Sequence, residues 1–360
     1  MEQYRDKIHI TYAGATANCS FNIRPTPDFV KEIKEAIANG KEYFIFNNVS
    51  ETVFTRYLTK IHLIANMFPE IDSRRFIFAV GATSADIMYK DYVAQNNIQR
   101  PISIICCHTF EHFAKTYLHK PLLDAVGEYQ IGVKPKKFVC FNKVHRYHRI
   151  ALTAKLLDLG LVDQSYYSFE GGYPEWINQL YNCERSIRTT ILDNADRFPI
   201  RLNISSARLN PVDLSINDID YHANSYFSVV TETIFYNKVN PRDTLIMHYE
   251  NTIFISEKTY KAIAFKHPFI VLAAPGMLKE LQRRGYQTFA PYIDESYDSI
   301  QDDDARLAAV VNEISRLCAF TDQEWIDWQT AIKPIVEHNQ RVMYESWDYN
   351  STTDIDKIFQ

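Results

Sequence analysis

The stretch that most constrains the fold is Phe254–Gly276, because it reads as a helix, a buried strand and a turn in direct succession. Ser256 is a good helix N-cap, and Glu257 in the first turn suits the positive end of the helix dipole. Pro268 ends that helix, and the apolar run Phe269–Leu272 is typical of a strand buried in a parallel sheet. The stretch therefore predicts one unit of an open α/β sheet.

The start of this helix also carries candidate binding chemistry. Lys258 and Lys261 are three residues apart and therefore share one face of the helix. Backbone N–H groups at a helix N-terminus, together with lysines, favour a diphosphate. The alternative is a charged helix face in solvent. The candidate ligand-binding residues here are Glu257, Lys258, Thr259 and Lys261.

The first part of the chain alternates between strand and helix patterns. Strands are expected near 7–12, 43–49, 75–80 and 102–107, with helices near 25–40, 51–68, 83–95 and 110–118. This alternation predicts a parallel sheet with right-handed crossovers. We therefore expect a Rossmann-like domain over residues 1–130, followed by a linker near 125–135.

A second α/β pattern follows that linker. It predicts a strand at 137–141, a basic loop at 142–149, a helix at 150–159 and a strand at 226–231, with 164–225 irregular apart from one helix near 176–183. Residues 237–252 read as a loop or hairpin, and helices are expected near 305–318 and 323–344. These patterns predict a second Rossmann-like domain over 136–330 and a C-terminal helix and tail over 331–360.

The basic loop is a second candidate phosphate site. It contains His145, Arg146, His148 and Arg149, and it follows a strand and opens a helix, where anions are favoured. Arg binds phosphate oxygens as a bidentate fork. The alternative is a basic surface loop, and a structural role is the simpler interpretation of both histidines.

Composition excludes several classes of protein. The 360 residues contain neither GxGxxG nor GxxxxGK[ST], which disfavours standard dinucleotide folds and Walker NTPases. A net charge of −5 argues against a protein that coats nucleic acid. No apolar run is long enough to span a membrane, and residues 1–6 do not read as a signal peptide, so we expect neither a transmembrane helix nor a signal peptide. The six scattered cysteines lack a CxxC pair, so we expect reduced thiols in a cytoplasmic protein.

Glu257-Lys258 at the head of a helix, followed by a small-residue turn and a Pro-apolar strand, resembles the donor-binding core of the fucosyltransferase-like nucleotide-sugar glycosyltransferases. Phage-encoded glycosyltransferases, some acting on modified cytosine in DNA, have similar segments. The resemblance covers mainly residues 136–300. It implies a GT-B-like architecture, with two Rossmann-like domains facing across a cleft and a C-terminal helix crossing back. It also implies that Glu257 contacts the nucleotide ribose and Lys258 the diphosphate.

The resemblance implies further roles in the donor site. Arg149 or Arg146 would neutralise the diphosphate. Glu232, at the end of an expected strand, would position the sugar, where the family has a Phe-Glu-Asn-Ser step. Glu250-Asn251-Thr252 is the alternative match to this step. Its residue types are closer to those of the family, but it lies too few residues before Glu257.

The catalytic base should come from the first domain, on the acceptor side. Transfer to a hydroxyl requires removal of its proton and stabilisation of the leaving diphosphate. Glu111 and His108 lead, with His112 and Asp86 as alternatives, because all four follow expected strand ends. No Asp-x-Asp metal signature stands at a strand end, so no metal is predicted, and Asp302–Asp304 reads as a solvated acidic loop. The Asp294–Asp298 segment matches a pattern of the phage-type enzymes or caps a neighbouring segment.

We therefore predict an inverting, metal-independent glycosyltransferase that uses a nucleotide-diphosphate sugar as co-substrate, needs no cofactor and acts on a glycan or another hydroxyl acceptor. One alternative is DNA modification, with hydroxymethylated or hydroxylated cytosine in phage DNA as the acceptor. The basic side chains available for it are Lys60, Arg74, Arg75, Arg100 and Lys115. Another alternative is a non-catalytic nucleotide-binding protein. The sequence does not identify the sugar, the nucleotide or the oligomeric state.

Overall fold

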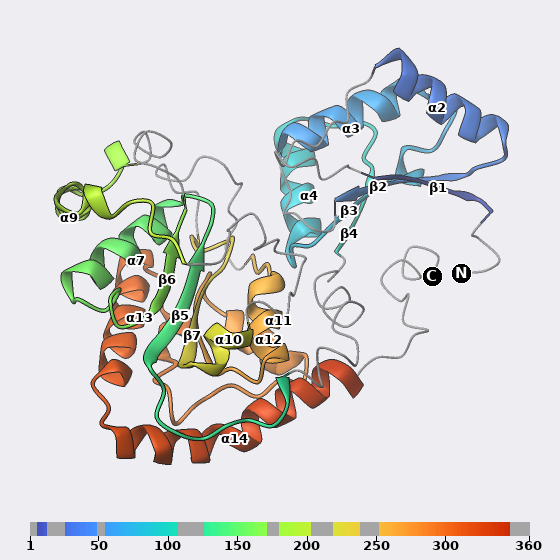
Figure 1. Cartoon of the computed structure of the whole chain (residues 1–360). Helices are drawn as coiled ribbons and strands as arrows, with labels where there is room; N and C mark the ends of the chain where they lie inside the picture. The colour runs from blue at the N-terminus through green and yellow to red at the C-terminus, as the bar shows by residue number, and fades with distance from the viewer. Residues whose placement is uncertain are drawn as a thin grey trace. The chain divides into compact units, whose positions relative to one another are not determined.

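The computed structural model describes residues 6–12, 26–48, 55–106, 126–170, 180–202, 219–237 and 252–345. These residues form two compact units, each built around a four-stranded parallel sheet (Figure 1). The first unit contains the described residues up to 106 together with 252–254, and the second contains those from 126 to 237 and from 255 to 345. The predicted α/β class with two parallel sheets is confirmed.

In the first unit the strands lie in sequence order, β1-β2-β3-β4, and all pairs are parallel. The described helices of this unit lie on one side of the sheet (Figure 1). Right-handed crossovers that always step in the same direction produce this arrangement. The strands are β1 (Ile8–Tyr12), β2 (Tyr43–Asn48), β3 (Phe76–Val80) and β4 (Ser103–Cys106), and the helices are α2 (Pro27–Ala38), α3 (Thr55–Met67), the 3₁₀ turn η1 (Ser73–Arg75) and α4 (Ala85–Gln95).

The core of the first unit follows the period-two alternation of its strands. Phe44 and Phe46 of β2 and Phe76 and Phe78 of β3 are buried against the helices. The residues between them face the other way, where Ile45, Ile77 and Ala79 form a smaller buried cluster. Because burial of each large apolar side chain stabilises the fold by roughly 1.5–3 kcal/mol, the four phenylalanines anchor this sheet to its helices.

The second sheet has the order β6-β5-β7-β8, so the chain changes direction between β5 and β7. Helices α7 and α13 lie on one side of this sheet, and α10, α11 and α14 lie on the other (Figure 1). Such a reversal opens a crevice at the carboxyl ends of the two strands where it occurs. The strands are β5 (Lys136–Asn142), β6 (Tyr166–Phe169), β7 (Ser225–Thr231) and β8 (Phe269–Leu272). The helices are α7 (Tyr147–Asp158), α9 (Arg185–Asp193), α10 (Ile219–Ala223), α11 (Glu257–Ala264), α12 (Met277–Arg283), α13 (Asp303–Cys318) and α14 (Asp322–Glu345), with 3₁₀ turns η2 (Ala195–Arg197) and η5 (Ser296–Ser299).

Two predictions for this unit need correction. Helix α7 begins at Tyr147 instead of residue 150, with Arg146 in extended conformation at the N-cap. His148 and Arg149 therefore lie in the first helical turn and not in a loop. The region 164–225, expected to be irregular apart from one helix near 176–183, contains β6, α9 and α10. Residues 176–179 of that expected helix are outside the described residues.

The stretch from residue 254 to 276 folds as predicted. The Ser256 hydroxyl caps α11 by accepting a hydrogen bond from Lys258 N at 3.3 Å, and β8 is buried along its whole length. α14 contacts α11, and its Trp325 stacks on Tyr226 with ring centroids 3.9 Å apart. The expectation that the C-terminal helix crosses back to the first domain stays a prediction. No helix in the described part of the chain is both long enough and apolar enough to span a membrane.

Candidate functional site

The carboxyl ends of β5 and β7 are joined by a buried side-chain hydrogen bond. Thr231 Oγ1 donates to Asn142 Oδ1 at 2.7 Å, across the point where the strand order reverses. Asn142 Nδ2 in turn donates to the Tyr167 hydroxyl and to Cys140 Sγ, both at 3.3 Å. Burial raises the pKa of the Cys140 thiol to about 12, so this side chain is a neutral part of the network. The network fixes the carboxyl ends of β5 and β7 relative to each other.

Arg149, in the first turn of α7, is 3% exposed and binds main-chain oxygens at the end of β7. Its guanidinium donates to Thr231 O at 2.9 Å and to Val144 O at 3.0 Å, and Glu232 O lies at 3.4 Å. His148 Nε2 donates to the same Glu232 oxygen at 3.1 Å. Burial and, to a smaller extent, the Arg146 charge lower the pKa of Arg149 to about 10, and the group stays protonated at neutral pH.

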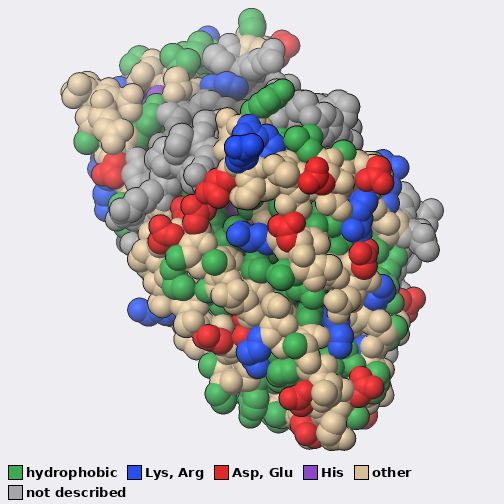
Figure 2. Space-filling model, turned by 90° about the vertical axis from the view of Figure 1, so that its left-hand side faces the viewer, with side chains coloured by type: hydrophobic (Ala, Val, Ile, Leu, Met, Phe, Trp, Pro, Cys, Tyr) green, Lys and Arg blue, Asp and Glu red, His purple; other side chains and the backbone are tan. Residues whose placement is uncertain are grey.

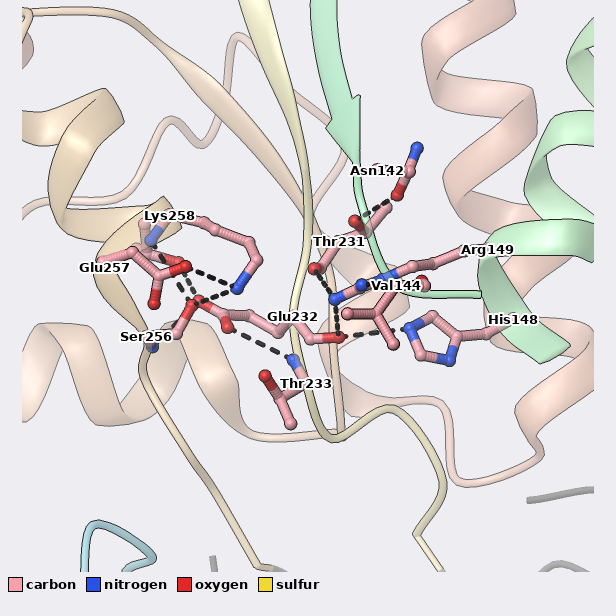
Figure 3. Close-up of polar contacts among 11 residues, drawn as sticks. Asn142, Val144, His148, Arg149, Thr231, Glu232, Thr233, Ser256, Glu257 and Lys258 are labelled. Atoms are coloured by element: carbon pink, nitrogen blue, oxygen red, sulfur yellow. Dashed lines mark hydrogen bonds and ion pairs between the residues drawn. The ribbon is translucent and has the colours of Figure 1, made fainter. Parts of the chain in front are cut away.

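Glu232 lies directly after β7 and is fully buried. Its Oε1 accepts hydrogen bonds from Thr259 Oγ1 at 2.6 Å and from Ser256 N at 3.1 Å, and its Oε2 accepts one from Thr233 N at 3.3 Å. In Figure 3 its main-chain oxygen points to Arg149 and its carboxylate to the start of α11. Glu232 therefore connects the first turns of two helices that lie on opposite sides of the sheet.

Lys258 is partly exposed at this cluster, whereas Glu257 beside it is buried. Lys258 Nζ lies 2.8 Å from Glu257 Oε1 and donates to Ser256 Oγ at 3.0 Å. The Lys258 side chain is 29% exposed and that of Glu257 11%, whereas Thr259 is completely buried. Lys261 Nζ lies 6.0 Å from the centre of the Phe141 ring, a cation–π contact.

The structure thus brings most of the predicted donor-site residues to one edge of the second sheet. Arg149 contacts the main-chain oxygen of Glu232. The Glu232 carboxylate accepts hydrogen bonds from Ser256 N and Thr259 Oγ1, on either side of Lys258 in the chain. Arg146 is half-buried at the N-cap of α7. His145 bonds Glu170 O, directly after β6. Sequence reasoning missed Asn142 and Thr231 as a pair, although each is a polar residue at a strand end.

Three of the four candidate base residues lie outside the described part of the chain. Glu111, His108 and His112 lie outside the described residues, as do Glu250 and Asn251. Asp86 is exposed on α4, with its carboxylate 3.7 Å from Lys90 Nζ.

The acidic segments have structural contacts. Asp302 caps α13 through Ala305 N, and Asp303 pairs with Arg306 at 2.6 Å. The Asp298 carboxylate accepts hydrogen bonds from Leu278 N and Lys279 N and so caps α12, which precedes it in the chain. In the described ranges, no group of three or more His, Cys, Asp or Glu side chains is arranged to hold a metal ion.

Three of the arginines considered for DNA binding make internal contacts in the first unit. Arg74 pairs with Asp72 at 2.8 Å, and Arg75 lies 3.6 Å from Glu42. Arg100 donates to the carbonyl oxygens of Ala65, Phe68 and Ile71, at and beyond the end of α3. Lys60 is half-buried, and Lys115 lies outside the described residues. On the face in Figure 2, acidic and basic side chains are interspersed.

The fold and site define an α/β protein with a buried polar and charged cluster where the second sheet reverses its strand order. Comparison with protein-family models found no matching family. Comparisons with curated proteins and with solved structures found no match either.

Proposed function

We propose that this protein is a glycosyltransferase whose second unit binds a nucleotide-diphosphate sugar at the carboxyl ends of β5 and β7. The observation that carries the proposal is the position of Glu232. It joins the first turns of α7 and α11 from opposite sides of the sheet at the reversal of strand order. Helix N-termini favour anions, and crevices at such reversals are where open α/β sheets bind ligands.

The cations of this cluster have different roles in the proposal. Lys258, being partly exposed, contacts the diphosphate directly, and Arg146 at the N-cap of α7 is the second direct contact. The terminal nitrogens of Arg149 donate to main-chain oxygens, so in this proposal Arg149 does not contact the diphosphate directly. It holds β7 against α7 and adds positive charge near the diphosphate. Glu257, beside Lys258, is the acceptor for a ribose hydroxyl.

In the proposed reaction, an acceptor hydroxyl oxygen bonds to the anomeric carbon while the bond from that carbon to the diphosphate oxygen breaks, with inversion. The hydroxyl proton passes to a carboxylate or imidazole base, for which Glu111 and His108 remain the candidates. The leaving diphosphate takes the bonding electrons, and its charge is stabilised by Lys258, Arg146 and the two helix N-termini. Among the basic side chains considered for DNA, Arg100 uses its guanidinium on three main-chain oxygens, and this favours an acceptor other than DNA.

A two-stage experiment tests the proposal. A thermal-shift screen against nucleotide diphosphates and their sugars should find a ligand that raises the melting temperature, because a ligand that binds the native state stabilises it. The protein is then incubated with the corresponding nucleotide-diphosphate sugar carrying a radiolabel in the sugar. The label released by hydrolysis or transferred to an acceptor is measured. Binding with neither hydrolysis nor transfer would identify a non-catalytic nucleotide-binding protein, and no shift with any nucleotide would contradict the proposed site.

A further inference from the structure

A second candidate site lies at the opposite edge of the second sheet, where β5, β7 and β8 begin. It is a cavity of about 60 Å³, lined by residues that precede β5, by α10 and by the turn between α11 and β8. A single water needs about 10–15 Å³ of such space, so the cavity can hold a ligand of a few non-hydrogen atoms. None of its lining residues belongs to the Glu232 cluster.

Lys266, one of the lining residues, has a backbone conformation that lysine rarely adopts. Its φ of +52° is left-handed, and it follows the C-cap of α11, with His267 N bonded to Ala262 O at 2.9 Å. Glycine is the usual residue at this position because other side chains strain the backbone there. The Lys266 ammonium donates to Gly127 O at 2.7 Å, across to the segment before β5. The side chain of Lys266 is therefore held at the cavity despite a local backbone cost.

Two buried histidines form another part of the lining. His222 is 6% and His267 4% exposed, and their ring centroids are 5.1 Å apart. His267 Nδ1 accepts from Ser228 Oγ at 2.7 Å, and its Nε2 donates to Ser225 O at 3.0 Å. Burial lowers the pKa of His222 to about 3 and that of His267 well below its usual value, so both rings are neutral.

The charges around the cavity are unbalanced. Lys134 is half-buried, burial lowers its pKa, and its charge lowers the pKa of His267 as well. Lys266 adds a second ammonium. Among the described lining residues the one carboxylate is Glu128, which is exposed. Two ammonium groups around a small, partly apolar cavity are complementary to an anion.

We propose that this cavity binds a small oxyanion, a carboxylate or inorganic phosphate, through Lys134 and Lys266. The bound anion would lie against His222 and His267 and would compensate the two lysine charges. This site is independent of the nucleotide site, because the two use different residues at opposite edges of the sheet.

The test uses the full chain with inorganic phosphate and acetate as separate probes. The histidine ring signals are followed by NMR during each titration, with His338, which contacts Gly285 O and is not part of the lining, as internal reference. We expect saturable shifts of the His222 and His267 signals with at least one probe. The probe that saturates identifies the ligand class.

The variants are Lys134→Met and Lys266→Gly, with Lys279→Met of the exposed face of α12 as the matched control. Each cavity variant should bind at least tenfold more weakly, as expected for a lost hydrogen bond to a charged group, and the control should bind like the wild type. Lys266→Gly relieves the left-handed backbone, so it should not lower the melting temperature, and its weaker binding cannot be attributed to misfolding. Absence of saturation with both probes, or unchanged binding by both cavity variants, would overturn the proposal.

Discussion

The Thr259 hydroxyl donates a 2.6 Å hydrogen bond to the buried Glu232 carboxylate, and this contact joins the end of β7 to the first turn of α11. Ser256 N, at the N-cap of the same helix, donates to the same oxygen at 3.1 Å. Glu232 is fully buried, so we interpret it as a residue that positions Lys258 and Glu257. The resemblance implied that Glu232 positions the sugar, but its role in positioning Lys258 and Glu257 requires no contact with the sugar.

Replacement of Glu232 should destabilise the second unit. Glu232→Ala leaves Ser256 N and Thr259 Oγ1 buried without this acceptor, and each such loss costs about 1–3 kcal/mol. Glu232→Gln keeps the size and one acceptor oxygen and should cost less. The measurement is urea unfolding followed by tryptophan fluorescence, because buried Trp325 and Trp328 belong to the second unit.

Asp193→Asn is the matched control, because Asp193 is exposed at the end of α9 and its replacement should change stability by less than about 0.5 kcal/mol. Equal free energies of unfolding for Glu232→Ala and this control would show that the Glu232 carboxylate does not stabilise the start of α11.

The buried histidines should make the stability of the second unit depend on pH. His222 has a pKa of about 3 in the folded protein and about 6.5 when unfolded, so between these values the unfolded chain binds more protons. Stability from His222 is therefore present above pH 6.5 and is lost as pH falls below it. His222→Phe should reduce the loss between pH 6.5 and 5 by about 1–2 kcal/mol.

The check is urea unfolding at several pH values in that interval for both proteins. His267 remains in the variant, and burial lowers its pKa too, so a residual loss of stability is expected. An identical pH dependence in the two proteins would show that His222 is not kept neutral by burial.

Asp298 should stabilise α12 as its cap. Its carboxylate accepts from Leu278 N at 3.0 Å and from Lys279 N at 3.3 Å, so Asp298→Ala removes both acceptors and should cost about 0.5–2 kcal/mol. Asp298→Asn, which keeps one acceptor oxygen, should lose less. Calorimetric melting of the three proteins gives the order, and equal melting temperatures for wild type and Asp298→Ala would exclude the capping role.

The elements predicted well from sequence are those with local signals. α11 and β8 follow from the cap at Ser256, the stop at Pro268 and the apolar run between 269 and 272. The start of α7 lacks such a signal, since Arg146 takes the N-cap position. His148 and Arg149 extend the helix because their side chains bond main-chain oxygens more than 80 residues away.

The site was predicted in part for the same reason. The basic and acidic residues at the starts of α7 and α11 are visible in the sequence as clusters at expected helix N-termini. The Thr231–Asn142 hydrogen bond joins residues 89 positions apart, and it depends on the pairing of β5 with β7. No local sequence pattern specifies that β5 pairs with β7, which follows it by more than 80 residues, so this hydrogen bond became visible only in the structure.

The central claim is that the Glu232 cluster binds a nucleotide diphosphate through Lys258. The most direct test is titration calorimetry of the full chain with the nucleotide diphosphate found in the screen, comparing wild type, Lys258→Met and the control Lys279→Met. We predict that Lys258→Met weakens binding at least tenfold, the loss of one hydrogen bond to a charged group, while Lys279→Met binds like the wild type. Equal affinity of Lys258→Met and wild type would contradict the proposed site.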